Sequence, residues 1–153
     1  MSDFRSTASF GKRQEYIAVA ELLRRGFDVY MTLVDDQQID CVVRLPESPP
    51  RYIDVQIKAR SRNAKNASTF AALEIREPRQ NFIFLFYSEA CETYWVMPSM
   101  DIVEKANRAK SGENVGRYRI VFANRNRAGK WVPRPKWRCY ENNFDLLAAR
   151  PKR

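Results

Sequence analysis

Two segments with alternating apolar side chains constrain the fold most strongly, because residues two apart in a strand share one face of a sheet. Residues 39–45 form the first segment and residues 52–59 the second, and a proline-containing turn separates them. Asp40 belongs to the first segment, and Gln56 and Lys58 share one face of the second. A carboxylate, an amide oxygen and an ammonium group on neighbouring strands suit metal-assisted attack on a phosphodiester. An exposed edge strand with outward polar residues would show the same pattern.

A helix is predicted upstream, over residues 10–25, with Gly26 as its stop. On a helical wheel, Glu15 falls inside an apolar arc made of Tyr16, Val19, Ala20, Leu22 and Leu23. The opposite, solvent-facing side carries Gln14, Glu21, Arg24 and Arg25. A carboxylate on a buried face is costly unless a cation or hydrogen-bond donors lie nearby. Glu15 therefore requires an explanation that Glu21 does not.

The remaining pattern predicts an α/β domain. Strands are expected at residues 27–33, 82–87, 94–97 and 118–123, with residues 70–75 ambiguous and a turn at Asp35 to Gln38. The apolar run 82–87 is typical of a central strand that is covered on both faces. Helices are expected from Ser99, as the N-cap, to about Lys110, and over residues 142–149. One domain, residues 1–153, is predicted, with a core at about 10–110 and a basic region, 111–153, packed on it.

The composition excludes several classes of function. The chain has no histidine, which removes Ser-His-Asp hydrolysis, histidine-ligated zinc and nucleases with a histidine base. Its three cysteines are widely spaced and match no metal-binding pattern, as expected of thiols in a reducing cytosol. The N-terminus lacks signal-peptide character, and the longest apolar run is too short to span a bilayer. We therefore expect a soluble, cytoplasmic protein without a membrane partner.

The net charge of +9 favours a polyanionic partner, nucleic acid above all. No acidic residue lies between Glu113 and Glu141, where basic side chains alternate with tyrosine and tryptophan. Such a mixture suits phosphate contacts and base stacking, although a solvated loop around core tryptophans is an alternative. The predicted nucleic-acid-binding residues are Arg60, Arg62, Lys65, Arg117, Arg125, Arg127, Lys130, Arg134 and Lys136.

The order of these elements resembles the PD-(D/E)xK, or restriction-endonuclease-like, superfamily over roughly residues 10–97. Glu15 stands on the first helix, Asp40 on a strand, and Gln56-x-Lys58 on the next strand. The Gln-x-Lys form resembles the Mrr-type branch, in which glutamine replaces the usual acidic residue. Ile39 departs from the proline of the superfamily motif. The resemblance implies a restriction-endonuclease-like core, which is a central mixed β-sheet flanked by helices.

The resemblance also implies a function and a role for each residue. The expected activity is a metal-dependent endonuclease that hydrolyses phosphodiester bonds of nucleic acid, DNA rather than RNA. Asp40 and Gln56 match the ligands of Mg²⁺, with Mn²⁺ as an alternative ion, and Glu15 matches a glutamate that supports the metal. Lys58 matches the lysine that orients the attacking water. Because Gln56 is neutral, it should bind Mg²⁺ more weakly than a carboxylate would.

Several alternatives stay open at this point. The same fold can serve as a catalytically inactive nucleic-acid-binding module, or its basic surface can bind an acidic protein. Asp54 shares the face of Gln56 and Lys58, as an extra ligand or, as we favour, an ion-pair partner of Arg60. The structure of the substrate is open among duplex, single strand, flap and junction. A homodimer is one candidate arrangement, because a single site nicks only one strand.

Overall fold

The computed structural model describes residues 3–34 and 37–150; Asp35 and Asp36 of the predicted turn, and both ends of the predicted domain, lie outside this part. Its helices are α1 (Asp3–Arg24), α2 (Ser99–Lys105), and the 3-10 helices η1 (Pro135–Tyr140) and η2 (Phe144–Leu147). Its strands are β1 (Asp28–Met31), β2 (Cys41–Leu45), β3 (Arg51–Arg60), β4 (Thr69–Leu73), β5 (Phe82–Ser88), β6 (Thr93–Pro98), β7 (Asn107–Arg108), β8 (Tyr118–Val121), β9 (Ala123–Arg125) and β10 (Trp131–Pro133). No helix in the described part is long and apolar enough to cross a membrane.

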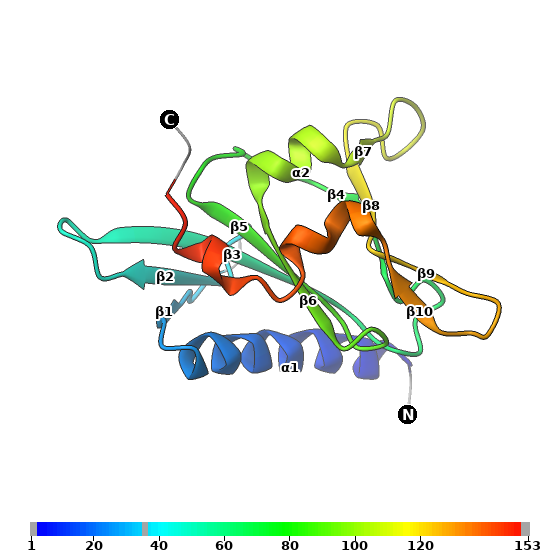
Figure 1. Cartoon of the computed structure of the whole chain (residues 1–153), viewed down its shortest axis with the longest axis horizontal. Coiled ribbons are helices and arrows are strands. Elements are labelled where there is room, and N and C mark those ends of the chain that lie inside the picture. The colour runs from blue at the N-terminus through cyan, green and yellow to red at the C-terminus, as the bar shows by residue number, and fades with distance from the viewer. Residues whose placement is uncertain (1–2, 35–36, 151–153) are drawn as a thin grey trace.

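The centre of the molecule is a five-stranded sheet with the order β1-β2-β3-β5-β6. β3 and β5 run parallel, and the other neighbouring strands run antiparallel. α1 lies along one side of this sheet, and α2 lies on the other side (Figure 1). The predicted fold class, a central mixed sheet flanked by helices, is confirmed.

The end of α1 follows the predicted glycine stop. Gly26 has φ +87, its N–H donates to the Leu23 carbonyl, and the Phe27 N–H donates to the Leu22 carbonyl. This pair of bonds closes the helix in a Schellman motif, which requires a left-handed residue that glycine adopts without strain. The start of the helix was predicted too late, because α1 is already helical at Asp3.

The buried side of α1 differs from the predicted apolar arc. Gln14, Ala18 and Leu22 are buried, whereas Tyr16 and Leu23 are exposed. Residues four apart form a narrow stripe on a helix, and this stripe faces the sheet. The helical wheel identified the periodicity but placed its centre wrongly, and so it assigned Gln14 to the solvent side.

Two apolar clusters cover the two faces of the central sheet. The first joins α1 and η2 to Val55, Ile57 and Leu85, among other buried residues. The second lies on the opposite face and contains Phe84 and Phe86 together with side chains from α2, β8 and η1. β5 contributes to both clusters, which explains its uninterrupted apolar sequence and confirms the prediction of a central strand.

Strands of the C-terminal third take part in two further sheets, one of which also includes β4. One has the order β4-β8-β7, and the other pairs β9 with β10. The predicted strand 118–123 is divided at Phe122, and the predicted helix 142–149 is reduced to η2. α2 ends at Lys105 instead of Lys110. Ser99 does not cap it, since its hydroxyl donates to the backbone carbonyl of Arg79 at 2.9 Å.

Candidate active site

Asp40, Gln56 and Lys58 come together where β2 begins. Cys41 pairs with Val55 in the antiparallel register, and the Asp40 N–H donates to the Val55 carbonyl at 2.9 Å. Asp40 therefore lies opposite Gln56. Val55 and Ile57 point into the cluster beneath α1, so Gln56 and Lys58 point to the other face of the sheet.

The Asp40 side chain is held between the two polar positions of β3. It is only 6% exposed, and its Oδ2 accepts a hydrogen bond of 2.6 Å from the backbone N–H of Ile57. Ile57 separates Gln56 from Lys58 along the strand. The backbone bond therefore fixes the carboxylate next to both functional residues, as a site that combines them requires.

Gln56 carries the most unusual atom of the site. The residue is 5% exposed, and its side-chain Oε1 is buried without a hydrogen-bond partner. Leaving a buried acceptor unsatisfied costs about 1–3 kcal/mol, so nearly all such groups in native proteins are paired. An amide oxygen is also an accepted ligand of hard cations. The unsatisfied oxygen thus fits the ligand role that the resemblance implied.

Glu15 lies on α1, which covers the face of the sheet opposite to that of Gln56 and Lys58. Its side chain is 21% exposed, and Oε2 lies 2.7 Å from the Lys12 ammonium, which supplies the cation that a half-buried carboxylate needs. The Glu15 interaction is also the first cause of the raised pKa of Lys12, and the charge of Asp40 adds to it. Burial raises the pKa of Cys41 to about 12, and the charges of Asp40 and Glu15 raise it further. The charges of both carboxylates therefore reach Cys41, at the start of β2.

Lys58 borders a cleft of about 420 Å³ between the end of β3 and β4. The cleft is lined by Gln38, residues 58–60, residues 70–74 and Arg117. Two of its residues, Gln38 and Ala72, are non-glycine residues in the left-handed region, with φ of +60 and +53. Such conformations are strained and concentrate at functional sites. A larger hollow, about 650 Å³, lies at the β2–β3 turn, and none of the four predicted catalytic residues lines it.

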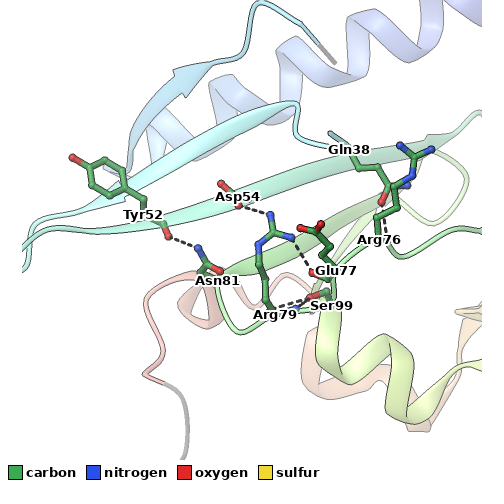
Figure 2. A network of polar contacts seen from close by, with 8 residues as sticks. All are labelled: Gln38, Tyr52, Asp54, Arg76, Glu77, Arg79, Asn81 and Ser99. Atoms are coloured by element: carbon green, nitrogen blue, oxygen red, sulfur yellow. Dashed lines mark hydrogen bonds and ion pairs between the residues drawn. The ribbon is translucent and has the colours of Figure 1, made fainter. Parts of the chain in front are cut away.

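Asp54 is not paired with Arg60, so the predicted ion pair is wrong. Its carboxylate binds the guanidinium of Arg79, at 2.5 Å. Figure 2 shows Arg79 reaching across to Asp54 from a loop that also bonds to Ser99. Arg60 instead donates to the Thr69 carbonyl. Arg79 was beyond sequence reasoning because it lies far from Asp54 along the chain and belongs to no recognisable motif.

Two other polar residues of this region were missed by the sequence analysis. Lys12, the partner of Glu15, lies one helical turn before it, and this spacing was a signal that could have identified it. Gln38 donates to the Glu74 carbonyl and accepts from the Arg76 N–H, and it joins the start of β2 to the loop beyond β4 (Figure 2). Its role depends on tertiary contacts alone.

The predicted nucleic-acid-binding residues divide into two groups. Arg62, Lys65, Arg117, Arg125, Arg127 and Lys130 are exposed. Arg60, Arg134 and Lys136 donate side-chain hydrogen bonds to backbone carbonyls, those of Thr69, Val121 and Lys105 respectively. The second group therefore stabilises the fold whatever else it binds. Trp137 is a core residue, 3% exposed. The alternative explanation, a solvated loop around core tryptophans, therefore holds for this tryptophan.

No arrangement of three or more histidine, cysteine, aspartate or glutamate side chains able to hold a metal ion exists within residues 3–34 and 37–150. The predicted ligand set has two carboxylates, Glu15 and Asp40, and one amide oxygen, that of Gln56. Only two of these three side chains are of the types named above, which is fewer than such a group requires. It is nevertheless an all-oxygen set, which suits Mg²⁺ or Mn²⁺ better than a soft metal.

The central mixed sheet with helices on both sides defines an α/β architecture. No protein-family model and no curated protein sequence matches the chain. The structure is similar to that of a bacterial homing endonuclease, I-Ssp6803I, with a TM-score of 0.62 and 18% sequence identity. The similarity covers 94% of this chain and 94% of that chain. At this identity the likeness establishes the shared fold.

Proposed function

We propose that this protein is a metal-dependent endonuclease that cleaves DNA, as a PD-(D/E)xK-type enzyme of the Gln-x-Lys variety. One observation carries the proposal: the unpartnered, buried Oε1 of Gln56 lies opposite Asp40. Most buried side-chain oxygens in native proteins are paired, so the unpaired oxygen suits a ligand role, although Arg51 Nε, Trp95 Nε1 and Glu141 Oε1 are also buried without a partner. The nuclease fold of the similar homing endonuclease supports the same conclusion.

Asp40 and Gln56 are the residues that would hold Mg²⁺ or Mn²⁺, with Glu15 supporting the ion from α1. When bound, such an ion lowers the pKa of a water molecule and offsets charge on the phosphate. The protein contributes a fixed carboxylate, because the Ile57 N–H holds Asp40 Oδ2 in place. It also limits solvent access, since both side chains lie beneath the surface.

Lys58 is the residue that would act on the reacting phosphate. It lies two residues from Gln56 on the same face, and it opens onto the cleft, where a nucleic-acid backbone can reach it. An ammonium group in this position stabilises the negative charge that develops on the phosphate oxygens. No histidine is available for this step, so the chemistry depends on lysine and on an activated water.

The second candidate function is a binding module without catalysis. The neutral Gln56 favours this alternative, because an amide contributes no charge to cation binding. The decisive experiment incubates the protein with labelled duplex, single-stranded, flap and junction DNA and with the RNA equivalents, in Mg²⁺, Mn²⁺ or EDTA. We expect DNA cleavage in the two metal ions and none in EDTA. Binding without cleavage of any substrate would instead select the module.

A further inference from the structure

The two-stranded ribbon formed by β9 and β10, residues 123–133, stands apart from the central sheet. Among the described residues its strands pair only with each other, with Arg125 opposite Trp131 and Asn124 opposite Val132. Figure 1 shows the connecting loop extending outward at the right-hand end of the molecule. Every residue from Asn124 to Lys130 is exposed. The outer part of the ribbon is therefore open to a partner.

The tip of the ribbon is nevertheless a defined structure. The Gly129 N–H donates to the Asn126 carbonyl, and the Asn126 N–H donates to the Lys130 carbonyl. Asn126 Oδ1 also accepts from the Lys130 N–H, and Gly129 takes φ +77. This is a type I turn followed by a left-handed residue, a common three-residue hairpin loop. A preformed tip loses less conformational freedom on binding than a flexible loop does.

The base of the ribbon is anchored in the core. Phe122 is fully buried and stacks on Trp95 at 4.4 Å between ring centroids. The Arg134 N–H donates to the Phe122 carbonyl, and the Ser68 hydroxyl donates to the Ala123 carbonyl. These contacts set the direction in which the ribbon leaves the domain.

The same anchor connects the ribbon to the end of β3. Ser68 adjoins Thr69, whose carbonyl binds Arg60, and Arg60 lies two residues beyond Lys58. A ligand that touches both the ribbon and the cleft beside Lys58 would therefore follow one edge of the domain. The ribbon itself contributes no part of the candidate active site.

The chemistry of the ribbon matches base edges as well as phosphates. Arg125, Arg127 and Lys130 give it three positive charges and no acidic residue. The guanidinium of Arg125 lies over the ring of Trp131, at 5.4 Å, whereas Arg127 stands at the exposed tip. Arginine forms paired hydrogen bonds with guanine O6 and N7, and asparagine does so with adenine. The major groove of B-form DNA, about 12 Å wide, admits a two-stranded ribbon.

From these observations we propose that the ribbon enters the major groove of duplex DNA and reads base identity, with Arg127 as its principal specificity residue. The proposal rests on the proposed function for the choice of DNA. It assigns sequence recognition to a region separate from Asp40, Gln56 and Lys58. Recognition and cleavage can therefore be tested independently.

The test selects preferred sequences from a library of randomised B-form duplexes, in EDTA so that no cleavage occurs. Wild type is compared with Arg127→Lys, which keeps the charge but loses the planar, two-pronged donor. Arg150→Ala, which removes one charge from an exposed residue outside the ribbon, is the control. Selected duplexes are then methylated at guanine N7, in the major groove, or at adenine N3, in the minor groove.

We expect wild type and Arg150→Ala to enrich the same sequence and to lose binding after N7 methylation. Arg127→Lys should lower discrimination at one base pair by on the order of 5- to 150-fold while nonspecific affinity changes little. No enrichment by wild type, unchanged discrimination by Arg127→Lys, or interference only at adenine N3 would each overturn the proposal. Cleavage without sequence preference would overturn it and leave the proposed function intact. Sequence selection without cleavage of any substrate would support the ribbon as a reader of base identity and would overturn the proposed function.

Discussion

Asp54 and Gln56 are two residues apart on one face of β3, yet their surroundings differ in kind. Asp54 is charged and forms an ion pair with the guanidinium of Arg79. Gln56 is neutral and more deeply buried, and its Oε1 has no partner. The first half of this strand face therefore holds an ion pair, and the second half contains a buried oxygen without a partner. The comparison shows that a charged residue next to a motif is not automatically part of the site.

The largest effect is expected at Lys58, two residues beyond Gln56 on this face. Lys58→Ala should lower the rate of DNA cleavage by about 10²–10³-fold, because one stabilising group aimed at developing charge is lost. Binding to DNA, measured in EDTA, should change little. The control is Lys65→Ala, which removes an exposed lysine and should weaken binding and cleavage together. Equal losses of binding and cleavage in Lys58→Ala would reduce it to an ordinary phosphate contact.

Asp54 should behave as a structural residue. Asp54→Asn should lower the free energy of unfolding by about 1–3 kcal/mol, since it removes the negative charge from the hydrogen bond that the half-buried Arg79 donates. Urea denaturation measures this change, and Mn²⁺ affinity should stay unaltered. Asp28→Asn removes a more exposed ion pair, 3.7 Å from Arg44, and should cost at most about 1 kcal/mol. A loss of Mn²⁺ binding in Asp54→Asn would restore Asp54 as an additional ligand.

Gln56 should show the opposite behaviour to Asp54. Gln56→Leu should raise the free energy of unfolding in EDTA by about 1 kcal/mol, because an unsatisfied buried oxygen is replaced by an apolar group. The stabilisation that Mn²⁺ gives to the wild type should disappear, since binding to the folded state is what produces it. Gln14→Leu, at another buried glutamine, should retain the Mn²⁺ effect. A Gln56→Leu protein that is still stabilised by Mn²⁺ would exclude Gln56 as a ligand.

The smallest effect is expected from Gln56→Glu. A carboxylate attracts a divalent cation more strongly than an amide does, so Mn²⁺ affinity should rise by roughly a few-fold to tenfold. The gain is limited because the new charge also draws Lys58 toward it, and cleavage should be kept or moderately reduced. Calorimetric titration of wild type, Gln56→Glu and Gln56→Ala gives the order of affinities. Equal affinity in all three proteins would contradict the ligand role that the resemblance to the Gln-x-Lys branch assigns to Gln56.

The sequence by itself determined the parts of this protein that depend on short-range periodicity. Alternation over residues 39–45 and 52–59 predicted which residues share a face, and the pairing of Cys41 with Val55, continued by one residue, puts Asp40 opposite Gln56. The apolar run of β5 predicted a central strand, and Gly26 predicted the end of α1. Each of these follows from backbone geometry, which repeats every two residues in a strand and every 3.6 in a helix.

Only the tertiary structure decided which partners those residues meet. Arg79 replaced Arg60 as the partner of Asp54 because the loop before β5 folds back over β3. Gln14 became buried and Tyr16 exposed because the sheet contacts only one narrow stripe of α1. The unsatisfied oxygen of Gln56 was likewise invisible in the sequence, since hydrogen-bond satisfaction depends on groups that are distant along the chain. Periodicity fixes the direction of a side chain, and packing alone determines what lies there.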